Sequence, residues 1–209
     1  MFTYPQKSAR LGHGTQGYAV IDLETTGFDA FGADRIVEIA IVRVDARGQE
    51  LGAFSTLVHP GRDMQASGIH HIEDTMVAEA PRFAEIAPSV LAWLEGVVVV
   101  AHNATFEDAF LTAELTRAGW LTPAVPALDT LTLAQSCVPT HNHKLSTVCH
   151  WAGVDIHGPH TALGDAHATA RMLPALLRRA GPQRWREPLP RLGGHLTGRY
   201  RPRESLTAL

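Results

Sequence analysis

Five consecutive apolar residues, Val-Val-Val-Val-Ala at 97–101, constrain the fold more than any other feature of this sequence. A strand with an apolar residue at every position is covered on both faces and lies inside a sheet rather than at its edge. The sequence therefore predicts an α/β domain in which helices pack on both faces of a sheet.

The remaining elements follow from the spacing of apolar residues, at a period of two for strands and of 3.6 for helices. Residues 45–48, Asp-Ala-Arg-Gly, are expected to form the turn of a hairpin. Strands are predicted at residues 18–23, 36–44, 54–58, 97–101 and 123–128, and helices at 83–94, 105–118, 131–136, 145–152 and 162–179. This order, strands first and then helices alternating with strands, indicates a mixed five-stranded sheet.

A length of 209 residues with 45% hydrophobic content allows one sizeable core. We expect a loose N-terminal arm over residues 1–16, one domain over 17–180, and a Pro- and Gly-containing tail over 181–209 that is flexible or docked on a partner. The N-terminal segment lacks the apolar stretch of a signal peptide, and no run of about 18 apolar residues occurs. A cytoplasmic protein with no membrane partner is expected.

The charges are divided unevenly along the chain. Residues 1–180 hold 12 Lys and Arg against 19 Asp and Glu, a net charge of −7, whereas residues 181–209 hold 6 against 2, a net charge of +4. An acidic body does not suit a protein that grips a nucleic acid duplex through a broad basic face. Metal ions or a partner would have to supply positive charge.

The first cluster of candidate site residues is Asp22-Leu-Glu24, at the end of the first predicted strand. Residues i and i+2 of a strand share one face, so the two carboxylates converge. Paired carboxylates repel one another unless a cation compensates, and they suit Mg²⁺ or Mn²⁺. Taken alone, the pair is better explained by a solvated acidic turn at the end of a strand.

The second cluster is the segment His-Asn-Ala-Thr-Phe-Glu at 102–107, where a strand leads into a helix. Asn103 and Glu107 are four residues apart and would share one helical face, while Phe106 points toward the core. The alternative is purely structural, with Asn103 or Thr105 as a helix cap and Glu107 as a first-turn acid favoured by the helix dipole.

The third cluster places His160 just before the last predicted helix and Asp165 within its first turns. An imidazole on a loop beside a carboxylate held by a helix suits a general base that acts near a metal ion. The alternative is a helix start that carries a surface histidine.

Together, the segments DLETTG, HNATFE and HTALGDAHAT resemble the three motifs of the DEDDh branch of the DnaQ-like exonucleases. The resemblance spans roughly residues 17–178 and includes the linking segments SGIHHIEDTMVAEAPRFAEI and HKLSTVCHWAGV. It implies an RNase H-like fold with a five-stranded mixed sheet, which agrees with the strand order derived above.

The resemblance also implies roles for individual residues. His160 would be the general base, and the terminal nucleotide would be held by Thr25, Thr26, Ile69, His70, Asn103 and Phe106. Two divalent ions, Mg²⁺ or Mn²⁺, would be held by four catalytic carboxylates, namely Asp22, Glu24, Glu107 and Asp165.

Two positions depart from the family pattern. The family has Asp where this chain has Glu107, which reaches one methylene further and could shift or weaken the second metal site. Asp108 follows it but lies about 100° around the helix and is a poor replacement. His71 stands where many relatives have Gly.

The sequence thus predicts a metal-dependent 3′-to-5′ exonuclease that releases nucleoside 5′-monophosphates from single-stranded or frayed DNA with a free 3′-OH, in proofreading or repair. The basic tail could bind a DNA polymerase or another protein partner. Two alternatives stay open: an exoribonuclease similar to RNase T or oligoribonuclease, and a nucleic-acid-binding module weakened at Glu107.

Overall fold

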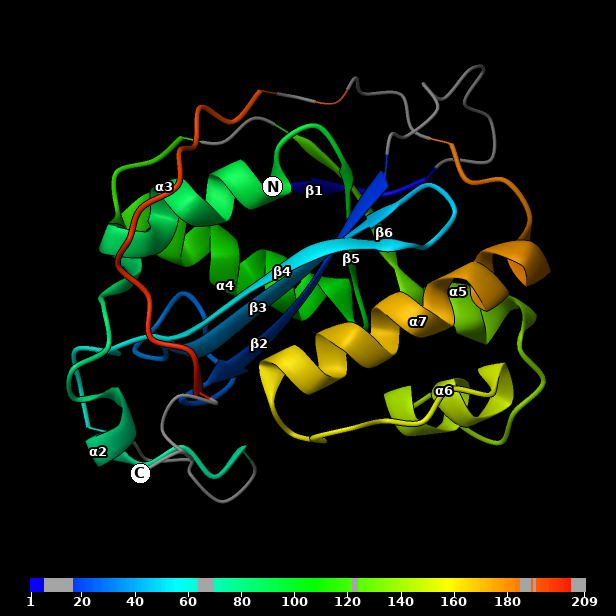
Figure 1. Cartoon of the computed structure of the whole chain (residues 1–209), viewed down its shortest axis with the longest axis horizontal. Coiled ribbons are helices and arrows are strands. Elements are labelled where there is room, and N and C mark those ends of the chain that lie inside the picture. Colours follow the sequence, from blue (N-terminus) through cyan, green and yellow to red (C-terminus); the bar gives the residue numbers. More distant parts are fainter. Residues whose placement is uncertain (6–16, 64–69, 122–123, 185–188, 190, 204–209) are drawn as a thin grey trace.

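A six-stranded mixed sheet forms the centre of the computed structural model, which describes residues 1–5, 17–63, 70–121, 124–184, 189 and 191–203. In the order β1-β6-β5-β2-β3-β4, the strands are β1 (Phe2–Thr3), β6 (Val125–Asp129), β5 (Val98–Ala101), β2 (Gly17–Thr25), β3 (Ile36–Asp45) and β4 (Glu50–Leu57). The last three pair antiparallel, β2 with β3 through the loop of residues 26–35 and β3 with β4 through a short turn, and the others pair parallel (Figure 1). The all-apolar strand β5 is an interior strand, as predicted.

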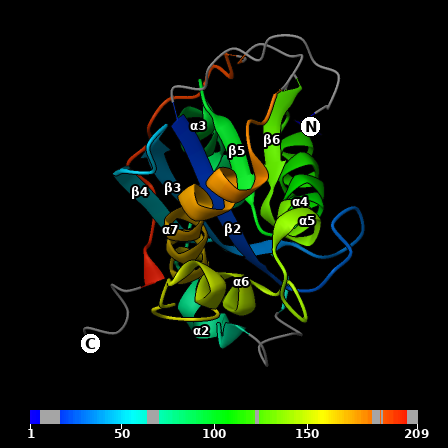
Figure 2. The same cartoon turned by 90° about the vertical axis from the view of Figure 1, so that its right-hand side faces the viewer.

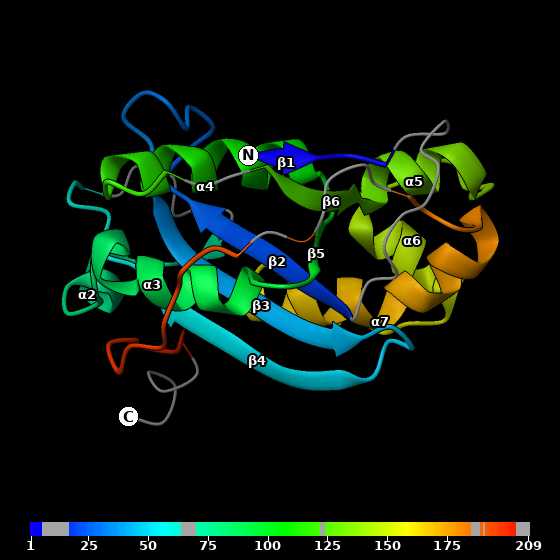
Figure 3. The same cartoon turned by 90° about the horizontal axis from the view of Figure 1, so that it is seen from above.

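Helices cover both faces of the sheet. On one face lie α3 (Phe83–Leu94) and α4 (Ala104–Arg117); on the other lies α7 (Ala162–Ala180), backed by α5 (Thr130–Cys137) and α6 (Leu145–Ala152), while the short α2 (Asp74–Val77) sits at one end (Figures 2 and 3). This confirms the predicted α/β class and its RNase H-like layering. Within the described ranges, no helix has the length and apolarity needed to cross a membrane.

Strand β2 shows how the sequence divides its side chains between the two layers. Ala19, Ile21 and Leu23 belong to the core beneath α3 and α4, whereas Tyr18 and Val20 belong to the core beneath α7. Because successive side chains alternate, the two acids that continue the second set, at 22 and 24, face α7. The hydrophobic pattern of the strand thus decides on which face the acids lie.

The sixth strand is the main difference from the predicted sheet of five. Phe2 and Thr3 pair in parallel with Val125 and Pro126, and Phe2 is buried, so the first residues of the expected loose arm belong to the fold. A two-residue strand carries no periodicity for a sequence pattern to reveal. Residues 6–16 of the arm lie outside the described residues.

The described part of the tail, residues 191–203, packs on its own domain, contrary to the expectation that it is flexible or docked on a partner. Leu192 is buried in the core beside α3. Gly194 approaches the backbone of that helix so closely that an added Cβ would lie 2.2 Å from the nitrogen of Ala92. A Gly- and Pro-containing segment without periodicity can still dock when its path follows a preformed surface.

Candidate active site

Three carboxylates meet between the sheet and α7. One carboxylate oxygen each from Asp22, Glu24 and Asp165 lies within 4.8 Å of the others. The first two project from the end of β2 toward α7, and the third comes from the first turn of α7. The convergence expected from the strand spacing of Asp22 and Glu24 is therefore present, and the third acid completes it.

Burial and mutual repulsion make these acids reluctant to ionise without a cation. Burial raises the pKa of Asp22 well above its ordinary value, and the neighbouring carboxylates, Glu107 first among them, raise it further. Burial and the adjacent Glu38 raise the pKa of Glu24 to about 7. Such a cluster is stabilised by a bound cation, because the cation favours the ionised form of each acid.

Glu107 lies apart from the three-acid cluster but beside Asp22. Its side chain is buried at the start of α4, and among the described residues its Oε2 has no hydrogen-bond partner. Burial raises its pKa well above the ordinary value. Asp108 turns elsewhere: its Oδ1 accepts a hydrogen bond from the Phe2 N–H at 3.1 Å, which ties β1 to α4.

These observations fit divalent metal ions. All four donors are carboxylates, the ligands that Mg²⁺ and Mn²⁺ prefer, and an unpartnered buried oxygen on Glu107 is a costly group that a cation would satisfy. Asp22 interacts electrostatically with Glu107 as well as with Glu24 and Asp165. The three-acid cluster offers ligands for one ion, and Asp22 and Glu107 are the residues that could share a second.

His160 stands on an exposed loop directly before α7. Its φ of 62° places it in the left-handed region, and its backbone N–H and imidazole both favour the ionised form of Asp165, although burial still raises the pKa of that acid. Thr161 caps the helix by accepting a hydrogen bond from the Gly164 N–H at 3.1 Å. The imidazole is thus held at the acid cluster with its ring open to solvent.

A sequence model described as "Exonuclease" matches residues 19–173, about three quarters of the chain. A DNA polymerase III subunit epsilon of Treponema pallidum is 34% identical over 170 residues, which cover 79% of this chain and 78% of that protein. The chain belongs to the exonuclease family.

Other relatives of this exonuclease-family chain are larger proteins or solved structures. A DNA polymerase III subunit epsilon-like protein of Rhodobacter capsulatus is 41% identical over 172 residues, covering 78% of this chain but 24% of its own length. This chain therefore spans about a quarter of that relative. The structure titled exonuclease X in complex with 5′ overhanging duplex DNA superimposes with a TM-score of 0.61 at 28% identity, covering 77% of this chain and 91% of that one. An exonuclease I structure, 18% identical with a TM-score of 0.69 over 79% of this chain and 41% of that one, shares the fold.

Two of the residues expected to hold a nucleotide in this exonuclease, Thr25 and Thr26, use their hydroxyls within their own loop. The Thr26 hydroxyl is occupied within its own loop, donating to Asp34 Oδ1 at 2.9 Å and accepting from the Arg35 N–H at 3.0 Å. The Thr25 hydroxyl donates to the Gly27 carbonyl at 2.7 Å. The two hydroxyls thus shape the turn beside the metal site. Ile69 lies outside the described residues.

His70 is buried, and its Nδ1 accepts a hydrogen bond from the Ile72 N–H at 3.1 Å. Burial lowers the pKa of this histidine, with a smaller contribution from the nearby Arg203 guanidinium. A neutral imidazole at the edge of the exonuclease site is the result. The following residue, His71, has a φ of 56°, in the left-handed region that glycine adopts most readily.

Asn103 occupies a position different from the one that helix spacing predicts, whereas Phe106 packs against the core as predicted. Asn103 is the N-cap of α4 with a φ of 88°, its side chain is exposed, and its Oδ1 accepts from the Thr105 hydroxyl at 3.2 Å. Because it is not helical, the shared face with Glu107 expected from a four-residue spacing does not form. Phe106 is partly buried and packs on the buried ring of Phe110, with 4.9 Å between ring centroids. Its ring also lies 6.2 Å from the exposed ring of Phe28.

Two charged residues beside the exonuclease site were not predicted from the sequence. Glu38 on β3 lies directly opposite Glu24 in the register, and it is 1% exposed. A lone acid within the apolar run IVEIAIV was the signal that could have found it. Arg203, from the C-terminal tail, lies 3.2 Å from the Glu38 carboxylate, and no local pattern marks it.

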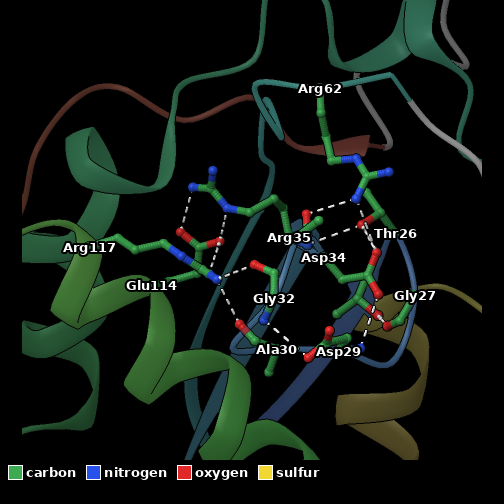
Figure 4. Close-up of polar contacts among 12 residues, drawn as sticks. Thr26, Gly27, Asp29, Ala30, Gly32, Asp34, Arg35, Arg62, Glu114 and Arg117 are labelled. Carbon is green, nitrogen blue, oxygen red and sulfur yellow. Dashed lines mark hydrogen bonds and ion pairs between the residues drawn. The ribbon is translucent and has the colours of Figure 1, made fainter.

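The loop after β2, residues 26–35, is held in one shape by buried and half-buried ion pairs (Figure 4). Glu114 of α4 is almost fully buried and pairs with both Arg35 and Arg117. Arg117 in turn donates to the carbonyls of Ala30 and Gly32 at 2.8 and 2.9 Å. The segment that joins the acids of β2 to the next strand is therefore rigidly supported.

Proposed function

We propose that this chain is a metal-dependent 3′-to-5′ exonuclease that hydrolyses the terminal phosphodiester bond of single-stranded or frayed DNA and releases nucleoside 5′-monophosphates. The observation that carries the proposal is the meeting of Asp22, Glu24 and Asp165 within 4.8 Å, with His160 beside them on an open loop. Membership of the exonuclease family supports the same reaction class.

In the proposed mechanism Asp22, Glu24, Asp165 and Glu107 would hold two divalent ions, Mg²⁺ or Mn²⁺. Such ions, when bound, would polarise the scissile phosphate, lower the pKa of an attacking water and stabilise the leaving oxygen. His160 takes a proton from the water as the water oxygen bonds to phosphorus. The bond from phosphorus to the 3′ oxygen of the penultimate nucleotide breaks, and that oxygen takes up a proton from solvent. The His160 ring faces solvent and can then release its own proton there.

DNA is the substrate that the comparisons favour. The relatives carry names of DNA polymerase III subunits, and one structural neighbour was solved with 5′ overhanging duplex DNA. We propose that the chain acts in proofreading or repair, in company with a DNA polymerase. Arg199, Arg201 and Arg203 of the tail pair with acids of the chain itself, so a polymerase that docks there would displace these pairs or use other residues.

The decisive experiment offers the purified chain 5′-labelled DNA and RNA oligonucleotides of one sequence, with Mn²⁺ or Mg²⁺. We expect a ladder of DNA shortened from the 3′ end, mononucleotide products, and no activity in excess EDTA. A 3′-phosphorylated oligonucleotide should resist, and Asp22→Asn is the inactive control. Faster shortening of the RNA would assign the exoribonuclease alternative, and binding without shortening would assign the binding module.

A further inference from the structure

The described part of the C-terminal tail crosses α3 and the end of β4, and its Arg203 lies beside the segment that leads into α7 (Figure 1). It is fastened at several points: the Thr197 N–H donates to Ser89 Oγ at 2.8 Å, the Arg201 N–H donates to Thr56 Oγ1 at 2.7 Å, and the Arg201 carbonyl accepts from the Leu57 N–H at 2.8 Å. These bonds fix the path of the backbone two residues before Arg203.

The guanidinium of Arg203 joins three segments at the site. Its Nη2 donates to the His70 carbonyl at 2.6 Å, and its Nη1 lies 3.3 Å from the His160 carbonyl and 3.2 Å from Glu38 Oε2. The same carboxylate oxygen accepts from the Ala162 N–H at 3.2 Å. The Glu38–Arg203 pair therefore holds the peptide units on both sides of residue 161.

This support matters because the loop it holds is exposed and has an unfavourable backbone conformation. His160 has a positive φ, which non-glycine residues keep only where the surroundings enforce it. Arg203 binds two carbonyls and a carboxylate through one planar fork, an arrangement that a lysine ammonium cannot reproduce. The side chain is 15% exposed and its donors are directed at protein atoms, so it is not placed as a phosphate-binding surface group.

We infer that Arg203 is a positioning residue of the exonuclease site, through which the C-terminal tail fixes the His160 and His70 segments against the acid cluster. The inference rests on the proposed function, in which His160 is the base. The tail of this chain is then part of the active site's construction, although it lies outside the region that the family model matches.

The test compares Arg203→Gln and Arg203→Lys with Arg199→Gln. Arg199 belongs to the same tail and also pairs with an acid. That acid, Glu85, lies on α3 and not at the site loops, and the Arg199 side chain is 77% exposed. We expect Arg203→Gln to lower kcat by roughly 10- to 100-fold with KM changed less than about threefold, because misplaced catalytic groups affect the transition state. Arg203→Lys should recover part of the loss, and Arg199→Gln should match the wild type.

A double-mutant cycle separates positioning from general loss of structure. If Arg203 acts through His160, Arg203→Gln should have little further effect on kcat in a His160→Ala background. Full additivity of the two losses, a wild-type kcat for Arg203→Gln, or a rise in KM alone would each overturn the inference.

A readout that needs no activity is the NMR spectrum of ¹³C-labelled histidine. Arg203→Gln should shift and broaden the His160 and His70 signals and leave that of His150, exposed on α6, unchanged. If the wild type shortens no oligonucleotide, the proposed function fails, while unchanged His160 and His70 signals in Arg203→Gln would show that the positioning inference fails by itself.

Discussion

At the scale of single residues, the non-glycine positions with unfavourable backbone mark the site. In the described part of the chain they are His71, Asn103 and His160, and each borders a predicted substrate or catalytic segment. Strained backbone persists only where the surrounding structure enforces it, so such residues tend to gather at functional sites. Their positions agree with the acid cluster as the functional centre.

His160 carries the first residue-scale prediction. We expect His160→Ala to lower kcat by about 10²–10⁴-fold while KM for a single-stranded oligonucleotide changes little, because a general base acts in the transition state. His167→Ala is the matched control, since this histidine lies on α7, which follows the His160 loop, but pairs with Glu50 at 3.3 Å. The measurement is the steady-state kinetics of both variants. A large loss of kcat in His167→Ala with a small loss in His160→Ala would assign the general base to His167.

The second residue-scale prediction concerns Glu107. Its burial and the raised pKa of Asp22 place it at the site, so Glu107→Gln should reduce turnover strongly, and Glu107→Asp should retain measurable activity. Asp108→Asn should leave kcat near the wild-type value and cost about 1 kcal/mol of stability through the weakened bond to the Phe2 N–H. Metal titrations of each variant provide the measurement. If Glu107→Gln left turnover unchanged and Glu107→Asp increased it, these results would instead identify a degenerate metal site.

At the scale of elements, the loop of residues 26–35 depends on α4 for its shape. Removing Arg117 would leave the buried Glu114 with Arg35 alone and would free the carbonyls of Ala30 and Gly32. Breaking a buried ion pair from one side costs on the order of 3 kcal/mol, and less here because Arg117 is 30% exposed. We expect Arg117→Ala to lower Tm by a few degrees and to speed amide hydrogen exchange in this loop. Arg62→Ala, at a more exposed pair with Asp34, is the milder control, and equal exchange in both variants would argue against the network.

At the scale of the whole molecule, the acid cluster makes stability depend on pH and on metal. The pKa of Asp22 is raised, and that of Glu24 is raised to about 7, whereas in the unfolded chain both return to about 4. Between roughly pH 4.5 and 7 the folded, metal-free protein binds more protons than the unfolded chain, so its free energy of unfolding falls as pH rises through this window.

The corresponding measurement is Tm in EDTA and with added Mn²⁺. In EDTA, Tm should be higher at about pH 5.5 than at about pH 8, and Asp22→Asn should raise the Tm at the higher pH while abolishing activity. Mn²⁺ at about 100 times its Kd should raise the wild-type Tm near pH 8 by roughly 5–10 °C, and that of Asp22→Asn much less. A metal-free Tm that rises with pH through the same window would contradict the crowding of these acids.

The sequence by itself determined most of the elements and the core of the site. Periodic hydrophobic patterns are local, so they located strands β2 to β6 and the five longer helices, and they placed Asp22 and Glu24 on one face of β2. The tertiary structure alone decided what depends on contacts between distant segments. Glu38 meets Arg203 across 165 residues, β1 pairs with β6 although Phe2 and Val125 lie 123 residues apart, and the tail docks on α3. Such contacts leave no periodicity in the chain, because they are selected by the shape and charge of a surface that exists only after folding.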